Sequence, residues 1–274
     1  MLPLAKGRII VRSAIRGNSF CPPDRNPGLE GESMKPTDSA EEVPRRVIVT
    51  GASRGLGRVL ARHLAKANWR VGVIARSSES LEELLSEGQV EAVEVADLTD
   101  ENAARHAIES LATTLGGLDA LINNAGKVYF EAFEEMQSEQ FLQVLKQNLM
   151  TAVNSSLSAL PHLKRSKKPS LIQISSISGI QPLPGGSAYS AAKHGLVGWS
   201  RSIFSELRQQ GIRVSLIHPG SIAAEPPSNT SEGPSDADPL DPVQIAQVVL
   251  QQLEAPPGTV LSEVEIRPLK PPRR

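Results

Sequence analysis

The sequence contains a single cysteine, Cys21, which excludes an internal disulfide and a cysteine-based metal cluster and fits a reducing compartment. Neither sign of charge is in excess, because 29 Lys and Arg residues stand against 30 Asp and Glu residues. The chain therefore offers no electrostatic basis for binding nucleic acid or an anionic membrane. No apolar run approaches the roughly 18 residues that a membrane-spanning helix needs. We expect a cytoplasmic protein with neither a membrane nor a nucleic-acid partner.

The first residues differ in composition from the rest of the chain. Residues 1–20 contain four basic residues and no acid, a composition typical of transit peptides. Several prolines and glycines follow, up to a second methionine at Met34. A flexible tail, a start codon placed too early and a targeting segment all stay open as interpretations. We expect residues 1–44 to lie outside the catalytic domain.

Beyond residue 45, short apolar runs alternate with segments of helical periodicity. The runs predict strands at 47–50, 71–75, 92–96, 120–123, 171–175, 214–218 and 264–267. The periodic segments predict helices at 56–67, 81–85, 101–115, 138–163, 188–209 and 242–253. This alternation predicts one α/β domain over residues 45–268, a doubly wound parallel sheet of about seven strands with helices on both faces. Residues 269–274 form a basic tail.

One segment, residues 221–241, interrupts this alternation because it holds four prolines and has no periodicity. It follows the carboxyl end of a predicted strand, which is where open α/β sheets bind ligands. We expect it to act as a lid, with disorder as the alternative.

A glycine-rich turn, Thr50–Gly57 (TGASRGLG), joins the first predicted strand to the first helix. Glycines at this position let backbone N–H groups approach a pyrophosphate at a helix N-terminus, which predicts a Rossmann-type dinucleotide site. The second strand ends at Ala75-Arg76, where NAD sites usually carry an acid. Arg76 and Arg54 could instead contact a 2′-phosphate, so we expect NADP(H). We expect Asp97, after the third strand, to face the adenine.

The helix after the fifth strand carries Tyr189 and Lys193, four residues apart and therefore on one helix face. A nearby ammonium favours the phenolate, which would let the tyrosine exchange protons near neutral pH. Ser176 lies thirteen residues before the tyrosine, at the end of the fifth strand, and Asn148 lies within the preceding helix.

The sequence resembles the short-chain dehydrogenase/reductase family in the order and spacing of its motifs. These are TGxxxGxG, the Asn123–Gly126 motif (NNAG), Asn148, SSxxG, YxxxK and Pro219-Gly220. The resemblance covers residues 46–267. It implies that Tyr189 is the general acid or base, that Lys193 tunes it, that Ser176 bonds the substrate oxygen and that Asn148 holds a relay water. The expected cofactor-binding residues are Gly51, Ser53, Arg54, Gly55, Leu56, Gly57, Arg76, Asp97, Leu98, Asn124, Ala125, Gly126, Tyr189, Lys193, Pro219, Gly220 and Ile222.

The family likeness implies an NADP(H)-dependent oxidoreductase that interconverts a carbonyl and an alcohol, and a homodimer or homotetramer. The sequence departs from the family pattern at two places. Ala224 occupies a position where relatives often have threonine, and the C-terminus lacks the glycine-rich sequence that ends acyl-carrier-protein reductases. A 3-oxoacyl-acyl-carrier-protein reductase and a non-catalytic NADPH sensor stay open as alternatives. We expect the substrate pocket to include Val128, Tyr129, Ile180 and Leu183, and we expect no metal site, since the histidines lack metal spacing.

Overall fold

Eight strands form one sheet in the order β1-β8-β7-β6-β5-β2-β3-β4 in the computed structural model, which describes residues 8–11, 44–223 and 239–270. The strands are β1 (Arg8–Val11), β2 (Arg46–Thr50), β3 (Arg70–Ala75), β4 (Ala92–Val95), β5 (Ala120–Asn123), β6 (Ser170–Ile174), β7 (Arg213–Pro219) and β8 (Glu263–Arg267). Strands β2 to β8 run parallel, and β1 pairs antiparallel with β8.

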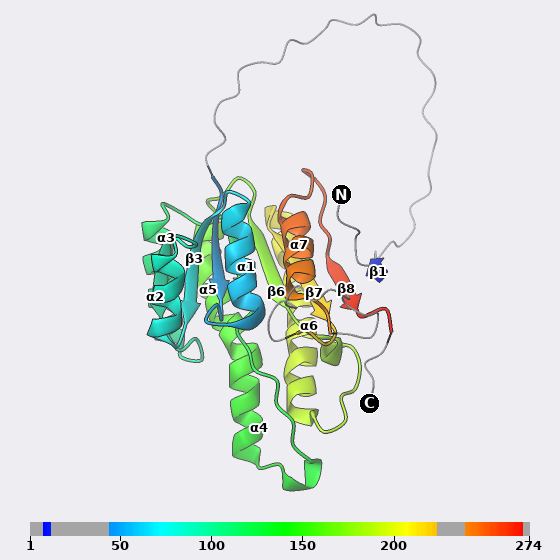
Figure 1. Cartoon of the computed structure of the whole chain (residues 1–274). Coiled ribbons are helices and arrows are strands. Elements are labelled where there is room, and N and C mark those ends of the chain that lie inside the picture. Colours follow the sequence, from blue (N-terminus) through cyan, green and yellow to red (C-terminus); the bar gives the residue numbers. More distant parts are fainter. Residues whose placement is uncertain (1–7, 12–43, 224–238, 271–274) are drawn as a thin grey trace, which may run out of the picture.

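Helices cover both faces of this sheet (Figure 1). They are α1 (Gly55–Lys66), α2 (Ser78–Ser86), α3 (Glu101–Thr114), α4 (Ser138–Leu145), α5 (Thr151–Leu163), α6 (Ser187–Leu207) and α7 (Pro242–Leu253). Short helical turns are η1 (Phe133–Glu135), the π-helical η2 (Lys146–Met150), η3 (Ile177–Gly179) and η4 (Arg208–Gln210). No helix of the described residues is long and apolar enough to cross a membrane.

The core consists of two aliphatic layers, one on each side of the sheet. Leu60 and Leu64 of α1 pack with Ile245 and Val249 of α7 on one face, and Figure 1 shows these two helices side by side. Residues of α3, α5 and α6 pack on the other face, among them Leu111. Central strands such as β6 are buried along their whole length, because a parallel sheet has helices on both sides.

The predicted doubly wound α/β sheet is confirmed, and the seven predicted strands agree with β2–β8 to within one residue at each end. The helix predicted over 138–163 is interrupted by the π-helical turn at Lys146–Met150. Strand β1, at the sheet edge, was not predicted. Most of the expected lid lies outside the described residues, as does Ala224. The two ends of the expected lid segment lie side by side, because Ile222 and Leu240 form a parallel bridge.

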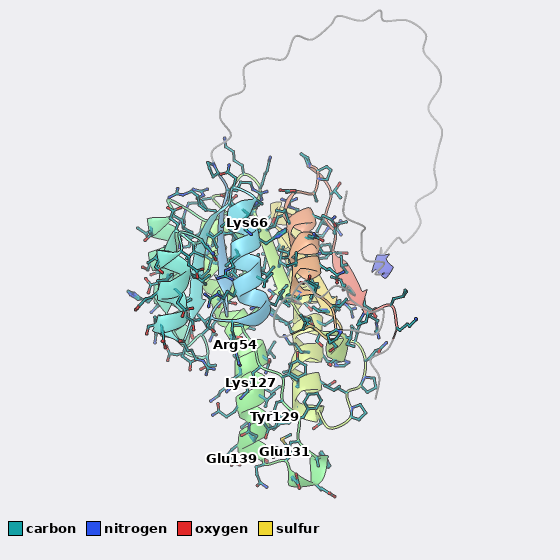
Figure 2. The ribbon with its side chains drawn as sticks, in the orientation of Figure 1. Arg54, Lys66, Lys127, Tyr129, Glu131 and Glu139 are labelled. Atoms are coloured by element: carbon teal, nitrogen blue, oxygen red, sulfur yellow. The ribbon has the colours of Figure 1, made fainter. Side chains whose placement is uncertain are left out.

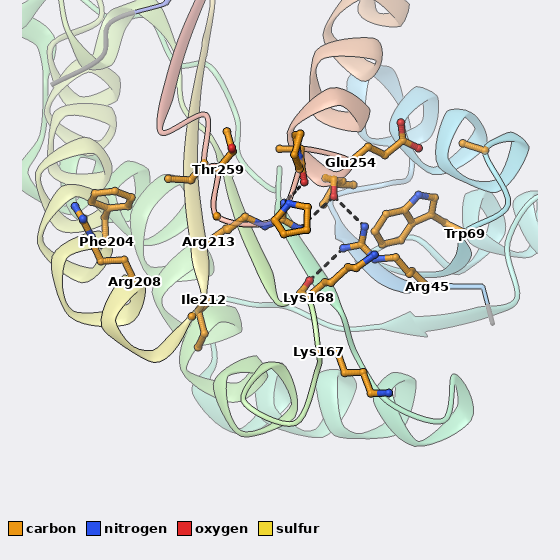
Figure 3. A pocket seen from close by; sticks show the side chains of 18 of the residues that line it. Arg45, Trp69, Lys167, Lys168, Phe204, Arg208, Ile212, Arg213, Glu254 and Thr259 are labelled. Atoms are coloured by element: carbon orange, nitrogen blue, oxygen red, sulfur yellow. Dashed lines mark hydrogen bonds between the residues drawn. The ribbon is translucent and has the colours of Figure 1, made fainter. Parts of the chain in front are cut away.

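A cavity of about 790 Å³ opens at the amino ends of the strands, where the C-terminal ends of α1 and α7 meet (Figure 3). Arg45 and Arg213 both donate hydrogen bonds to the carbonyl of Leu253, the last residue of α7, at 2.9 and 3.2 Å. Arg45 also lies over the ring of Trp69, 4.2 Å from its centroid. These cations satisfy carbonyls that a helix end leaves unpaired, so we assign them a structural role.

Asp119, directly before β5, connects three segments of the chain. Its carboxylate accepts hydrogen bonds from Nε and Nη2 of Arg46 at 2.8 and 3.0 Å and from the Ser166 hydroxyl at 2.6 Å. Burial acts to raise the pKa of Asp119, but the hydrogen bonds from Arg46 and Ser166 outweigh it and hold this pKa below its ordinary value. The charged carboxylate therefore stabilises the fold.

We predict that Asp119→Asn lowers the free energy of unfolding at pH 7 by about 1–3 kcal/mol, the cost of breaking a buried charged hydrogen-bond network. A depressed folded pKa stabilises only where the carboxylate is ionised. The deficit should be complete above about pH 4, the ordinary aspartate pKa, and should vanish as the pH falls through the lower folded value. Urea unfolding measures both.

The control is Glu91→Gln, which removes the exposed ion pair between Arg70 and Glu91. Exposed pairs contribute about 1 kcal/mol or less. Equal losses of unfolding free energy in Asp119→Asn and Glu91→Gln would show that the Asp119 network stabilises the fold no more than an exposed ion pair does.

Candidate active site

The glycine turn between β2 and α1 is shaped by contacts too close for any side chain. Gly51 has a φ of +70°, and its N–H donates to the Ile74 carbonyl at 2.8 Å. A Cβ on Gly57 would lie 2.2 Å from the Gly51 carbonyl oxygen, so only glycine fits there. Gly57 therefore packs directly on the turn, which holds the start of α1 close to the end of β2.

Thr50 and Asn124 hold this turn against the end of β5. The Thr50 hydroxyl accepts the backbone N–H groups of Asn124 and Ala125, each at 3.0 Å. The Asn124 side-chain amide donates to the carbonyls of Thr50 at 3.0 Å and Gly51 at 3.2 Å. Asn124 thus positions the glycine turn, and Thr50 is a positioning residue that the sequence reasoning missed, although it opens the glycine motif.

Two arginines and one aspartate lie at the far end of the turn. Arg54 precedes α1 and Arg76 follows β3, and both side chains are exposed. Asp97 accepts the backbone N–H of Thr99 at 2.9 Å and its hydroxyl at 2.8 Å. These hydrogen bonds, and then the charge of Arg76, hold the pKa of Asp97 below its ordinary value. An anion at this end of the turn would meet the cations of Arg54 and Arg76 and the carboxylate of Asp97.

Ser176 caps the turn η3 directly after β6, and its hydroxyl accepts the N–H of Ser178 at 3.1 Å. Gly179 ends this turn against α6, since a Cβ there would lie 2.7 Å from Oγ of Ser175 and 2.9 Å from the Lys193 carbonyl. The glycine of the SSxxG motif therefore brings Ser176 close to the tyrosine helix, where its hydroxyl acts to lower the pKa of Tyr189.

Tyr189 and Lys193 share the inner face of α6, and both are buried, at 7% and 4% exposure. The Lys193 ammonium lies 5.8 Å from the centre of the Tyr189 ring and donates to the Ile174 carbonyl at 2.9 Å. Burial lowers the pKa of Lys193 to about 8. Burial also raises the pKa of Tyr189, although the hydrogen bond with Ser176 acts to lower it. In the protein alone, burial outweighs the expected effect of the lysine on the phenol.

Asn148 lies in the π-helical turn η2 and is 1% exposed. Its amide donates to the Val144 carbonyl at 3.0 Å, and its Oδ1 accepts the Lys127 N–H at 2.9 Å. A Cβ on Gly126 would lie 2.7 Å from Oδ1 of Asn148 and 3.8 Å from Nζ of Lys193. The widened helical turn therefore brings Asn148 to the neighbourhood of the lysine, a use of π-turns that is common at functional sites.

Most of these groups line one cavity of about 760 Å³ at the carboxyl ends of the strands, whereas Thr50 and Gly179 lie behind its wall. Every residue expected to bind cofactor or to act in catalysis lies on its wall. Val128 and Leu183 of the expected substrate pocket line it too, whereas Tyr129 and Ile180 do not. Sequence reasoning missed Lys127, Phe130, Gln147 and Thr151, which carry no motif and reach the wall only through the fold.

Comparison with known proteins points to one family. A family model described as short chain dehydrogenase matches residues 45–234. The chain is 31% identical over 213 residues to carbonyl reductase family member 4 of Xenopus laevis, covering 76% of this chain and 90% of that protein.

Two solved structures share the fold. An alcohol dehydrogenase from the archaeon Thermococcus sibiricus, complexed with 5-hydroxy-NADP, is 25% identical with a TM-score of 0.74, covering 84% of this chain and 99% of that one. A metagenomic short-chain oxidoreductase in complex with NADP is 32% identical with a TM-score of 0.70, covering 82% and 98%.

Burial of Lys193 predicts a specific pH dependence of stability. Because folding lowers its pKa from 10.5 to about 8, the unfolded chain holds more protons between these values, and the folded state gains stability as the pH rises. Each pKa unit corresponds to about 1.4 kcal/mol. Relative to Lys193→Met, the wild type should therefore gain roughly 2–3 kcal/mol between pH 8 and 10.5 in urea unfolding.

Lys66→Met, at the exposed end of α1, is the matched control and should show no such pH-dependent difference. If the difference in unfolding free energy between the wild type and Lys193→Met stayed constant between pH 8 and 10.5, the lowered pKa of a buried Lys193 would be contradicted.

Proposed function

The chain belongs to the short-chain dehydrogenase family, and from this membership we propose that it is an NADP(H)-dependent oxidoreductase that interconverts a carbonyl and an alcohol. The observation that carries the proposal is the meeting of Tyr189, Lys193 and Ser176 on the wall of a cavity that also contains the glycine turn. These groups come from separate elements, so their convergence depends on the whole fold.

The cavity fits a dinucleotide phosphate. Gly51, Gly55 and Gly57 line it at the start of α1, where the backbone N–H groups that a helix N-terminus leaves unpaired favour a pyrophosphate. Arg54 and Arg76 line the same cavity and offer two cations to a 2′-phosphate, and the solved relatives with bound NADP or 5-hydroxy-NADP support this choice. When bound, the reduced nicotinamide supplies a hydride to the carbonyl carbon.

The residues of the chain manage the proton and the charge on oxygen. Ser176 donates a hydrogen bond to the carbonyl oxygen, which stabilises the charge that grows there as the C=O electron pair moves onto oxygen. Tyr189 donates its proton to the same oxygen and completes the alcohol. In the reverse direction the phenolate removes that proton.

Lys193 acts through the tyrosine. Its pKa of about 8 leaves it predominantly protonated at neutral pH, so it favours the phenolate when the phenol gives up its proton. Asn148, beside Lys193, is placed to hold a water that restores the proton from solvent. These roles rest on the positions of the groups and on the family resemblance.

A homo-oligomer belongs to the same proposal. Leu142, Met150 and Leu157 follow one another along α4, η2 and α5 with 54%, 38% and 60% of each residue exposed. Apolar exposure of this kind favours association with a second copy, and sedimentation would measure it.

The chain's only two tyrosines provide a matched pair for testing the mechanism. We predict that Tyr189→Phe lowers kcat for NADPH-dependent carbonyl reduction by about 10²–10⁴-fold, the usual contribution of general acid catalysis. Tyr129→Phe removes a hydroxyl that bonds Glu131 at 2.8 Å, outside the cavity wall, and should leave kcat within a fewfold range. Equal rates for the wild type and Tyr189→Phe would leave a nucleotide-binding protein without this chemistry.

Cofactor preference is tested at Arg54 and Arg76. Replacing both by alanine should raise the KM for NADPH about 100-fold or more, because each removes a charged hydrogen bond worth about 1.5–3 kcal/mol, and should leave the KM for NADH nearly unchanged. Lys66→Ala is the control, since Arg54 and Lys66 lie at opposite ends of α1 (Figure 2). A similar loss for both nucleotides would argue against 2′-phosphate recognition.

A further inference from the structure

Two large apolar side chains stand exposed at the mouth of the cavity. Val128 and Phe130 are 52% and 63% exposed, yet both line the wall beyond Tyr189. Their neighbour Tyr129 does not line the cavity and packs against the cluster of Val144, Ala188 and Tyr189. Apolar surface left open to water at a binding site gains stability when an apolar ligand covers it.

The wall that presents Phe130 is tied to the opposite loop. The Glu131 N–H donates to the Gly185 carbonyl at 2.7 Å, which joins the segment after β5 to the loop before α6. Leu183 of that loop also lines the cavity. This hydrogen bond therefore holds the segment that carries Phe130 beside the loop that carries Leu183.

The segment that follows Phe130 carries charge of one sign, although none of its glutamates lines the cavity. Residues 128–145 contain four glutamates, Glu131, Glu134, Glu135 and Glu139, and no lysine or arginine. Figure 2 shows Glu131 and Glu139 beyond Tyr129, on the part of the chain that leads away from Lys127. Among the charged lining residues, Arg54, Arg76 and Asp97 belong to the nucleotide end and Lys193 lies beneath Tyr189, which leaves Lys127 at the substrate end.

We propose that the substrate is an uncharged, apolar carbonyl compound that covers Phe130, and that the glutamates of residues 131–139 discriminate against the same acyl group on a polyanionic carrier. This inference rests on the proposed function and narrows its substrate class. A coenzyme A thioester or an acidic carrier protein would bring several negative charges to this segment. Repulsion between exposed charges acts within about 8–10 Å at ordinary salt and weakens as salt rises.

The first test compares two thioesters with the same 3-oxobutanoyl group, one on neutral N-acetylcysteamine and one on coenzyme A. We expect kcat/KM for the neutral thioester to exceed that for the coenzyme A thioester at least tenfold at low salt, and the ratio to narrow as salt rises. Glu134→Gln combined with Glu135→Gln should narrow the ratio as well, whereas Glu206→Gln at the far end of α6 should not. A preference of the wild type for the coenzyme A thioester would overturn the proposal. If that preference were lost in Lys127→Met, Lys127 would be the residue that recruits anions.

The second test uses two phenylalanines that lie close in sequence. Phe130 lines the cavity, whereas Phe133 is 85% exposed and does not line it. Phe130→Ala should lower kcat/KM for a neutral aryl ketone at least fivefold, mainly through KM, and Phe133→Ala should leave it unchanged. Equal effects of the two variants would overturn the substrate assignment while the reductase activity itself persists. Absence of NADPH-dependent reduction of any carbonyl by the wild type would instead reject the proposed function.

Discussion

The candidate active site depends on the burial of one ammonium group. Lys193 is 4% exposed and donates to the Ile174 carbonyl at the end of β6, and burial lowers its pKa to about 8. An ammonium in this position is costly, so the fold has to surround it with fixed polar groups. The carbonyl end of a parallel strand provides one such group. Burial also raises the pKa of Tyr189, so the phenol is protonated at neutral pH in the protein alone.

Topology explains why these groups meet. In a parallel sheet every strand ends at the same edge, so the segments after β2, β5, β6 and β7 all reach one cavity. Small residues then allow close approach: Gly57 against Gly51, Gly126 against Asn148, and Gly179 against Lys193. The opposite edge of the sheet holds a cavity of similar volume, but two of its arginines bond the end of α7.

The cavity has two chemically different halves. One half is lined by the glycine turn, Arg54 and Arg76, and the other is lined by Val128, Phe130 and Leu183. Between them lie the serine, tyrosine and lysine. In the function that we propose, the residues of the reaction and the residues that select the substrate thus lie on different segments of the chain. The loops of the apolar half can change without disturbing the buried ammonium.

The sequence by itself determined the alternation of strands and helices, the glycine turn and the catalytic candidates, because these follow from local periodicity and from motifs with fixed spacing. Only the tertiary structure decided the rest. The π-helical turn at Asn148, the use of Asn124 to hold the glycine turn, and the hydrogen bond between Glu131 and Gly185 depend on contacts between distant segments. So does the pKa of Tyr189, since a helical spacing of four residues fixes the neighbouring lysine but does not reveal how deeply both groups are buried.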